Sequence, residues 1–250
     1  LGIGGSATND GGAGMLAELG ARFLDASGRR IGTSPDALAA LASVDLRGMD
    51  PRLAGLRVEA ACDVDNPLLG ERGASAVFGP QKGAAPEDVE FLNSVLERWA
   101  EASGRRELAR RPGAGAAGGL GFALLAFLGA ALEPGVELVS RAVGLAEAVT
   151  GAELVLTGEG SVDAQTLAGK TPAGVARTAA ARGVPTVILA GRVKPDADVL
   201  LSTGCVAILS VSQGQAQSLA QMLRAAPVNT ERAAATAMRL WTRRPGPAAI

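Results

Sequence analysis

Histidine and tyrosine are absent from the 250 residues of this sequence, and aromatic residues of all kinds make up only 3%. The lack of histidine excludes a Ser-His-Asp triad, a histidine general base and a zinc site with histidine ligands. Any catalysis must then use carboxylates, lysine, arginine, small polar side chains, cysteine and backbone groups. This set suits phosphoryl transfer, in which positioning and neutralisation of charge do most of the work.

The sequence also has few cysteines and a net charge close to zero. The two cysteines, Cys62 and Cys205, lie far apart in apolar runs, which indicates buried thiols in a reducing compartment and not a disulfide. With a net charge of −1, neither nucleic acid nor a membrane is an expected partner. The uncharged run 112–132 could span a bilayer, but its six glycines instead indicate a glycine-rich loop and a buried helix.

Glycine, in contrast, is abundant and gathers in loops that carry polar groups. Six of the first fourteen residues are glycine, and they surround Ser6, Asn9 and Asp10 just before a helix expected over 11–19. Such a loop directs backbone N–H groups and the positive end of a helix dipole at one place, which suits phosphate. Asn9 can add a donor and Asp10 a magnesium ligand or a base. The alternative is a tight turn with a helix cap.

Two further loops combine glycine with charge. Asp63 and Asp65 follow a strand expected over 56–62, where residues two apart face the same way, so they either share one magnesium ion or simply end the strand. Lys82 stands between glycines in a loop expected over 70–83, where it reaches a phosphate or lies solvated at the surface. The glycine-rich run 113–121 either admits a ligand or allows close packing.

The last loop follows a strand expected over 153–157 and contains Gly158, Glu159, Gly160 and Asp163. Gly169-Lys170-Thr171 comes soon after, at a helix start. This is not a standard P-loop, because the glycine required five positions earlier is replaced by Ala164. A lysine at a helix N-terminus beside two carboxylates still fits a site for phosphate and metal.

Strands and helices alternate in the second half of the chain. The pattern predicts strands over 153–157, 185–190 and 205–211, with helices listed here in order: 136–149, 171–181, 218–225 and 230–241. This alternation indicates an α/β fold with a doubly wound, parallel, Rossmann-like or flavodoxin-like sheet. We expect a central α/β lobe over 1–150 and part of the Rossmann-like lobe over 151–245. An amphipathic helix is expected over 86–102.

Five stretches resemble, in order, the signature blocks of bacterial glycerate kinase, the class that makes 2-phosphoglycerate. They are Gly4–Gly12, Cys62–Leu68, Val77–Gly83, Gly113–Gly121, and Leu156–Gly160 followed by Gly169-Lys170. The resemblance extends to about Trp241. It implies a cytoplasmic kinase that uses ATP and Mg²⁺ to phosphorylate a small molecule, D-glycerate. It also implies two α/β lobes with the active site in the cleft between them.

The resemblance implies that these blocks line the cleft, and the chemistry of the side chains suggests a role for each residue. The expected catalytic residues are Asp10, which orients or deprotonates the glycerate hydroxyl, and Asn9, Lys82 and Lys170. The expected nucleotide contacts are Gly4, Gly5, Ser6, Gly158 and Gly160, and the expected substrate contacts are Asp63, Asp65, Gly118 and Gly119. Magnesium is assigned to Glu159 and Asp163.

Two departures from the family pattern lead to other expectations. The family usually has arginine after Gly-Glu-Gly, where this chain has Ser161. Its N-terminal third, which supplies strands to the sheet that includes 153–157, has no counterpart in this sequence. Without those strands the sheet would expose an apolar edge, which favours a homodimer or aggregation. The alternatives to an active kinase are a non-catalytic remnant that binds nucleotide or a small acid, and a kinase or phosphatase for another hydroxy acid.

Overall fold

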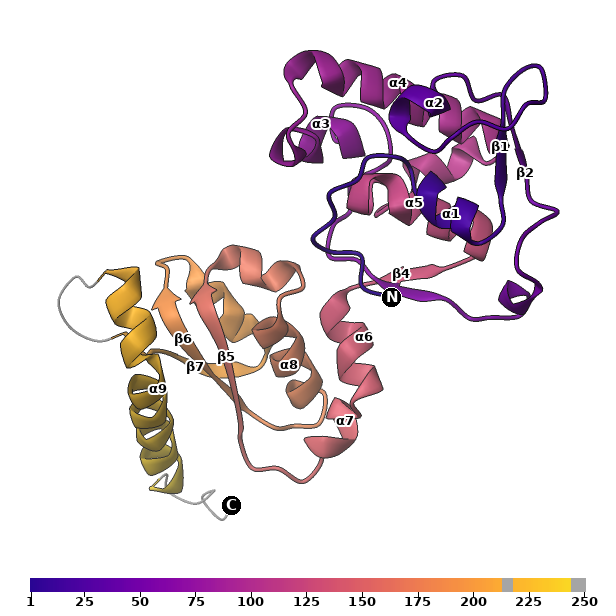
Figure 1. Cartoon of the computed structure of the whole chain (residues 1–250). Coiled ribbons are helices and arrows are strands. Elements are labelled where there is room, and N and C mark those ends of the chain that lie inside the picture. The colour runs from indigo at the N-terminus through magenta and orange to yellow at the C-terminus, as the bar shows by residue number, and fades with distance from the viewer. Residues whose placement is uncertain (213–217, 244–250) are drawn as a thin grey trace. The chain divides into compact units, whose positions relative to one another are not determined.

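The computed structural model describes residues 1–212 and 218–243, and the chain divides into two compact units, Leu1–Gly135 and Val136–Ile250 (Figure 1). The sequence had suggested a boundary after residue 150. Residues 244 and 245, the last of the expected second segment, lie outside the described residues. Each unit has its own hydrophobic core.

The first unit is mostly helical, with two small two-stranded sheets. Strand β1 pairs antiparallel with β2, and β3 pairs parallel with β4. Short 3₁₀ helices occupy Pro51–Leu53, Pro80–Lys82 and Arg106–Arg110. The other elements are α1 (Ala13–Glu18), β1 (Arg22–Leu24), α2 (Pro35–Leu38), β2 (Ser43–Asp45), β3 (Glu59–Ala61), α3 (Ala74–Phe78), α4 (Pro86–Ala102), α5 (Ala116–Leu128) and β4 (Ala131–Glu133).

The core of the first unit is built around Trp99 of α4, which is fully buried. Its ring stacks on Phe127 at 5.3 Å between centroids and contacts Phe23 and Phe122. Helix α4 has the bounds predicted from its apolar periodicity, because Val95, Leu96 and Trp99 recur on one face and are buried. Four of the seven aromatic residues of this chain therefore form one cluster.

Some predictions for the first unit were wrong. The segment 70–83 is not a loop throughout, since it forms α3 and the 3₁₀ turn Pro80–Lys82. Helix α3 has five residues, too few to give a helical period that a sequence reveals. The unpredicted strand β4 begins within the run 112–132, after the left-handed Gly129 (φ 58°) that ends α5.

The second unit contains the predicted parallel sheet. Its strands are β5 (Val155–Val162), β6 (Thr186–Val193) and β7 (Cys205–Ser210), in the order β5-β6-β7. The helices are α6 (Gly135–Ala142), α7 (Leu145–Ala148), α8 (Thr171–Ala180) and α9 (Leu219–Thr242), with 3₁₀ segments Ala164–Ala168 and Ala197–Thr203.

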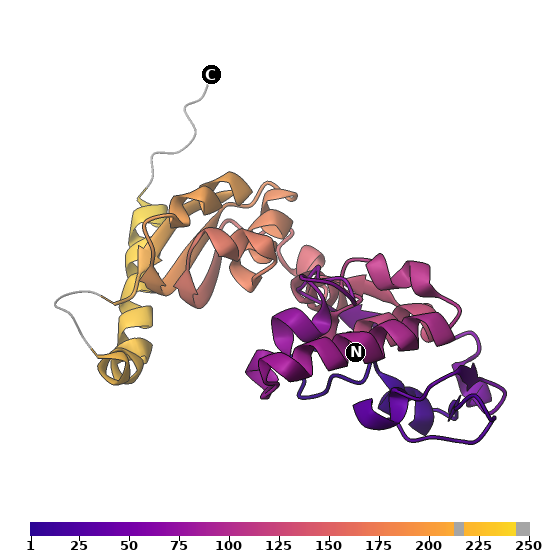
Figure 2. The ribbon, with the colours of Figure 1, turned by 90° about the horizontal axis from the view of Figure 1, so that it is seen from above.

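Both faces of this sheet are covered by helices. Along β6, Ile188 and Ala190 pack in the cluster that includes α8, whereas Val187 and Leu189 pack in the cluster that includes α9. Figures 1 and 2 show α8 on one side of the strands and α9 on the other. The α/β fold class with a doubly wound sheet is therefore confirmed, and the near-continuous apolar sequence of β6 follows from burial on both faces.

Three element boundaries differ from those expected in the second unit. The helix expected over 136–149 is broken at Gly144, whose φ of 67° is left-handed. Strand β5 does not end near Thr157, because its pairing with β6 continues to Val162. The two helices expected at the end of the chain form one helix, α9, with Pro227 inside it.

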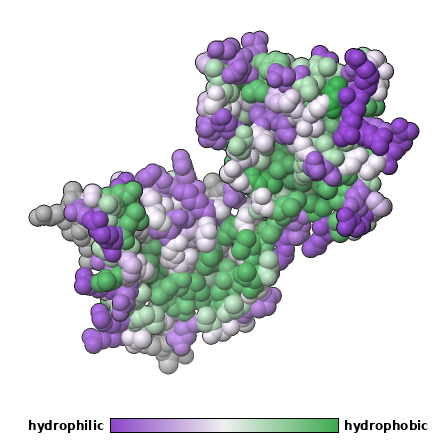
Figure 3. Space-filling model, in the orientation of Figure 1, coloured by the Kyte–Doolittle hydropathy of each residue, from purple (hydrophilic) through white to green (hydrophobic). Residues whose placement is uncertain are grey.

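Strand β5 lies at one edge of the described sheet, where β6 is its hydrogen-bonded neighbour. Its Leu156 is 37% exposed, and Figure 3 shows hydrophobic surface around this part of the second unit. None of the described helices is long and apolar enough to cross a membrane. Both cysteines are free, as predicted, but only Cys205 is buried and Cys62 is half-buried; the burial raises the pKa of each thiol.

Candidate functional site

The carboxylate of Asp10 is fixed by the start of the first helix. Its Oδ1 accepts a hydrogen bond from the Gly12 N–H (3.0 Å), and its Oδ2 accepts one from the Gly14 N–H (2.9 Å). A carboxylate here satisfies N–H groups that the helix leaves unpaired, and it lies at the positive end of the helix dipole. The helix cap and a functional role are compatible, because each oxygen keeps a second lone pair.

Lys82 is held against the first glycine-rich loop. Its Nζ donates to Ser6 Oγ (2.9 Å) and to the carbonyl oxygen of Thr8 (2.7 Å), across more than seventy positions of sequence. Burial lowers the pKa of Lys82, and the nearby charge of Asp10 opposes that effect. Lys82 is therefore a partly buried and oriented cation, not a solvated surface lysine.

Lys82 borders two cavities of the first unit. One, of 220 Å³, is lined by the loop residues Gly4, Gly5 and Ser6 together with Asp63. The other, of 710 Å³, is lined by Asn9 and Asp10 among others. Most of the expected site residues of the first unit therefore line the two cavities that Lys82 borders.

The side chain of Asn9 is held by a hydrogen bond to a residue that the sequence analysis did not single out. Its Nδ2 donates to the hydroxyl of Ser75 (2.9 Å), which is fully buried on α3. The Oδ1 atom of Asn9 is buried and, among the described residues, has no hydrogen-bond partner. Ser75 went unnoticed because its segment was interpreted as a loop, and nothing in its local sequence marks it.

Gly118 and Gly119, the expected substrate contacts, lie packed against the first loop. Both are buried and absent from the lining of the two cavities. A Cβ on Gly118 would overlap the Thr8 carbonyl oxygen, and one on Gly119 would lie 2.7 Å from Gly11 Cα. These glycines allow the start of α5 to pack against the first loop, which was the alternative reading of this run.

Ala117 is next to this contact and has a strained backbone. Its φ of 54° and ψ of 41° are left-handed, and it is the one non-glycine residue with positive φ in the described part of the chain. This conformation is costly for a residue with a Cβ. Ala117 lines the 220 Å³ cavity, so the strain lies beside the candidate site.

Replacing Ala117 by glycine is expected to raise the free energy of unfolding by about 0.5–1 kcal/mol, because glycine removes the left-handed strain. The matched change Gly118→Ala is expected to lower it by about 2–3 kcal/mol, since the new Cβ would displace the first loop. Urea denaturation of both variants measures the difference. A destabilised Ala117→Gly variant would contradict the strain at this position.

Asp63 and Asp65 do not converge on one ion. Strand β3 ends at Ala61, so the alternation expected of a strand does not reach them. Asp63 Oδ1 accepts from the N–H of Gly135 (2.8 Å), whereas exposed Asp65 pairs with Arg72 (2.9 Å). Asp63 lines the 220 Å³ cavity and Asp65 does not, so only Asp63 remains a candidate for substrate contact.

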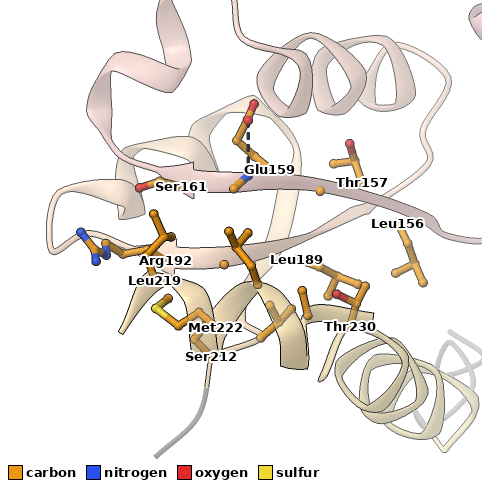
Figure 4. A pocket seen from close by; sticks show the side chains of 16 residues that line it. Leu156, Thr157, Glu159, Ser161, Leu189, Arg192, Ser212, Leu219, Met222 and Thr230 are labelled. Carbon is orange, nitrogen blue, oxygen red and sulfur yellow. Dashed lines mark hydrogen bonds between the residues drawn. The ribbon is translucent and has the colours of Figure 1, made fainter. Parts of the chain in front are cut away.

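The second unit has a cavity of 850 Å³ along β5 and β6 and the first half of α9. Gly158, Gly160 and Ser161 contribute to its lining, and apolar side chains such as Leu189 and Met222 form much of the wall. Figure 4 shows Glu159 pointing away from Met222, with one carboxylate oxygen accepting from the N–H of Gly160 (3.3 Å). The expected nucleotide contacts of this unit therefore lie together on β5.

Asp163 is engaged by two lysines. Lys194 Nζ donates to its Oδ2 (2.7 Å), and Lys170 Nζ lies 3.7 Å from its Oδ1. The hydrogen bond from Lys194 lowers the pKa of Asp163 and raises that of Lys194. The sequence analysis did not single out Lys194, although a lysine shortly after an apolar strand was the signal that could have found it.

The surroundings of Asp163 do not favour the magnesium role expected of it. A cation bound to Asp163 would meet two ammonium groups that repel it. In the described ranges, 1–212 and 218–243, neither Glu159 nor Asp163 belongs to a group of three histidine, cysteine, aspartate or glutamate side chains that could hold a metal ion. Asp163 instead serves as the partner of Lys170 and Lys194.

Comparison with known proteins assigns the family. A model described as the glycerate kinase family matches residues 1–242. The chain belongs to this family. Glycerate kinase of Bacillus subtilis strain 168 is 47% identical over 217 residues, which cover 86% of this chain and 57% of that protein. Glycerate 2-kinase of Escherichia coli K12 is 46% identical over 214 residues, which cover 84% of this chain and 56% of that protein.

A solved structure agrees with this assignment. The crystal structure ascribed to glycerate kinase 2 from Salmonella typhimurium LT2 has a TM-score of 0.81 and 44% identity, and the match covers 97% of this chain and 64% of that one. The chain therefore spans a little over half the length of the curated glycerate kinases it matches.

The serine that departs from the glycerate kinase pattern has an arginine directly opposite it. Ser161 on β5 pairs in register with Arg192 on β6, and both line the 850 Å³ cavity. Figure 4 shows the two side chains at the same end of the cavity. A guanidinium group is therefore present where serine had suggested its loss, a fact that only strand pairing reveals.

Proposed function

We propose that this chain acts as a glycerate kinase, transferring the γ-phosphoryl group of ATP to D-glycerate to give 2-phosphoglycerate. The family match and the names of the relatives support the reaction and the substrate. The name of the Escherichia coli relative, glycerate 2-kinase, supports phosphorylation of the 2-hydroxyl. These relatives do not favour the alternative of a non-catalytic remnant.

The position of Lys82 is the observation that carries the proposal. Its ammonium group is fixed by Ser6 and Thr8 at the border of two cavities, with Asp10 and Asn9 in the lining of the larger one. An oriented, partly desolvated cation stabilises charge on a transferring phosphoryl group better than a solvated one. Lys82 therefore neutralises the phosphoryl group in the transition state.

Asp10 orients the glycerate hydroxyl and accepts its proton as the new O–P bond forms and ADP leaves. Its carboxylate is suited to this role because two backbone N–H groups fix its direction while leaving lone pairs for a substrate. Asn9 adds an amide beside it. Magnesium, when it is bound to the nucleotide, would neutralise phosphate charge.

The proposal also covers the compartment and the partners of the protein. We place the reaction in the cytoplasm, in keeping with the two free thiols. The partners are small molecules, with neither nucleic acid nor membrane among them. The homodimer expected from the sheet edge stays a prediction.

Calorimetry with magnesium–ATP and with D-glycerate, followed by a coupled ADP-release assay on the same sample, tests the proposal. We expect both ligands to bind and ADP release to depend on D-glycerate. A panel of small hydroxy acids is the control for substrate choice, and a better substrate than glycerate would redirect the assignment. Binding without ADP release, in a folded sample, would favour the non-catalytic alternative.

Arg192 gives a prediction about the departure at position 161. We expect Arg192→Ser to raise the KM for ATP about tenfold, the effect of losing one charge-assisted hydrogen bond. Moving the arginine back, in the double variant Ser161→Arg with Arg192→Ser, should restore most of the affinity because the two positions pair in register. Steady-state kinetics measures both, and an unchanged KM in the single variant would contradict this role.

A further inference from the structure

Three charged residues meet at one edge of the parallel sheet. Asp163 follows the last residue of β5, and Lys194 follows the last residue of β6. Lys170 is the N-cap residue of α8. Because β5 and β6 are parallel, their carboxyl ends lie at the same edge, which is where doubly wound sheets bind ligands.

The three side chains of this cluster differ in how far they are buried. The side chain of Asp163 is 8% exposed, whereas those of Lys170 and Lys194 are 43% and 50% exposed. Asp163 is fixed further by Thr166, a buried residue whose hydroxyl accepts from the Asp163 N–H (3.1 Å). The carboxylate is thus a buried anchor, and the two ammonium groups face solvent around it.

The cluster keeps a net positive charge, since it has two lysines and one aspartate. The first turn of α8 has no acidic residue to offset it, and the positive end of that helix dipole adds to it. Of the nearby charged groups, Arg192 also contributes a positive charge and Asp196 a negative one. The exposed face of the cluster therefore attracts anions.

The choice of lysine is itself informative. Of the 24 basic residues in the sequence, only three are lysine: Lys82, Lys170 and Lys194. Arginine is used at all other basic positions, including the surface ion pairs, so lysine is not the ordinary surface cation of this chain. A lysine ammonium is a compact point charge with rotatable donors, whereas the guanidinium group is a planar fork.

We propose that Lys170 and Lys194 together bind the polyphosphate chain of a nucleotide, and that Asp163 is the positioning residue that holds their ammonium groups side by side. The inference rests on the proposed function for its natural ligand, ATP. It replaces the metal-ligand role expected for Asp163 and adds Lys194 to the residues of the reaction. Two neighbouring ammonium groups neutralise adjacent phosphate groups and leave Asp163 no direct contact with the nucleotide.

Calorimetric titration of the full chain with inorganic tripolyphosphate, without magnesium, tests the binding step. We expect Lys170→Ala and Lys194→Ala each to weaken binding about tenfold. Arg177→Ala is the matched control, because it removes one exposed positive charge from the same helix as Lys170 and should change the affinity less than about twofold. No binding by the unaltered chain, or equal losses in all three variants, would overturn the proposal.

A double-variant cycle tests the positioning role of Asp163. In an Asp163→Asn background, the further change Lys194→Ala should weaken tripolyphosphate binding only about twofold, because Lys194 is no longer held in place. A full tenfold effect in that background would show that Lys194 acts independently of Asp163. If Asp163→Asn instead abolished heat from titrated MgCl₂ while the lysine variants kept it, Asp163 would be a metal ligand and the proposal would fall. Near-ultraviolet circular dichroism checks that each variant is folded.

These experiments distinguish a failure of the phosphate site from a failure of the proposed kinase function. Tripolyphosphate binding that depends on both lysines, without glycerate-dependent ADP release, would keep the phosphate site and reject the kinase. Glycerate-dependent ADP release with an unchanged KM for ATP in Lys194→Ala would keep the kinase and reject this site.

Discussion

Replacing Lys82 by alanine is expected to lower kcat/KM for glycerate phosphorylation at least about 100-fold, which corresponds to about 2.7 kcal/mol of transition-state stabilisation. Lys82 is the one lysine of the first unit, and Ser6 and Thr8 hold its ammonium group in place. Steady-state measurement of ADP release gives the ratio. A near-normal rate in Lys82→Ala, with circular dichroism unchanged, would reject the role of Lys82.

Two companion measurements sharpen this prediction. Ser6→Ala removes one of the two groups that orient Lys82 but keeps its charge, so we expect a smaller loss, about fivefold. The pH profile gives an independent readout. Burial lowers the pKa of Lys82 below its ordinary value of 10.5, and the active form is the protonated one, so kcat/KM should fall as the pH rises through the lowered pKa.

Lys82→Arg separates charge from geometry. Arginine stays protonated at alkaline pH, so this alkaline fall should disappear in the variant. Its planar guanidinium group cannot reproduce the donors to Ser6 and Thr8, so the rate should remain below that of the unaltered chain. The same alkaline fall in Lys82→Arg would mean that another group titrates.

Replacing Trp99 by alanine is expected to lower the free energy of unfolding of the first unit by about 4 kcal/mol. The indole is fully buried in the aromatic cluster, and its Nε1 donates to the carbonyl oxygen of Gly11 (2.8 Å). The change therefore leaves a cavity and a buried carbonyl without its donor. It should also loosen the loop that carries Asp10, because Gly11 is the next residue.

Urea denaturation followed by far-ultraviolet circular dichroism measures this loss. Phe91→Ala is the matched control, because it removes an aromatic ring that is 39% exposed on the same helix and should cost less than about 1.5 kcal/mol. Trp99→Phe keeps much of the packing but loses the donor, so its cost should be intermediate. Equal losses in Trp99→Ala and Phe91→Ala would contradict the central place of Trp99.

Local patterns in the sequence were sufficient for much of the fold. The apolar period of 3.6 residues located α4, and the alternation of apolar strands with helices predicted a parallel, doubly wound sheet. Sequence patterns did not predict an element that was too short, or one whose bounds depend on a neighbouring strand. Helix α3 has five residues, and β5 continues past Thr157 because β6 offers hydrogen bonds as far as Val193.

Some residues of the candidate site could likewise be singled out from the sequence, and others could not. The sequence identified the first loop, Lys82 and Lys170, because glycine beside charge has a physical meaning that needs no tertiary information. It did not reveal that Asp163 pairs with Lys194, because this partner, at 2.7 Å, lies 31 positions away. Arg192 was missed for the same reason, because its pairing with Ser161 depends on the register of two strands.

The sequence by itself determined which chemistry is available to this chain: phosphate-directed loops, carboxylates and lysines, with no histidine. Composition and spacing fix these properties because they depend on residue type and on nearest neighbours along the chain. Only the tertiary structure decided which groups act together, such as Ser6 with Lys82, Ser75 with Asn9, and Lys194 with Asp163. Those pairings join residues 31 to 76 positions apart, and packing of the folded chain is what brings them into contact.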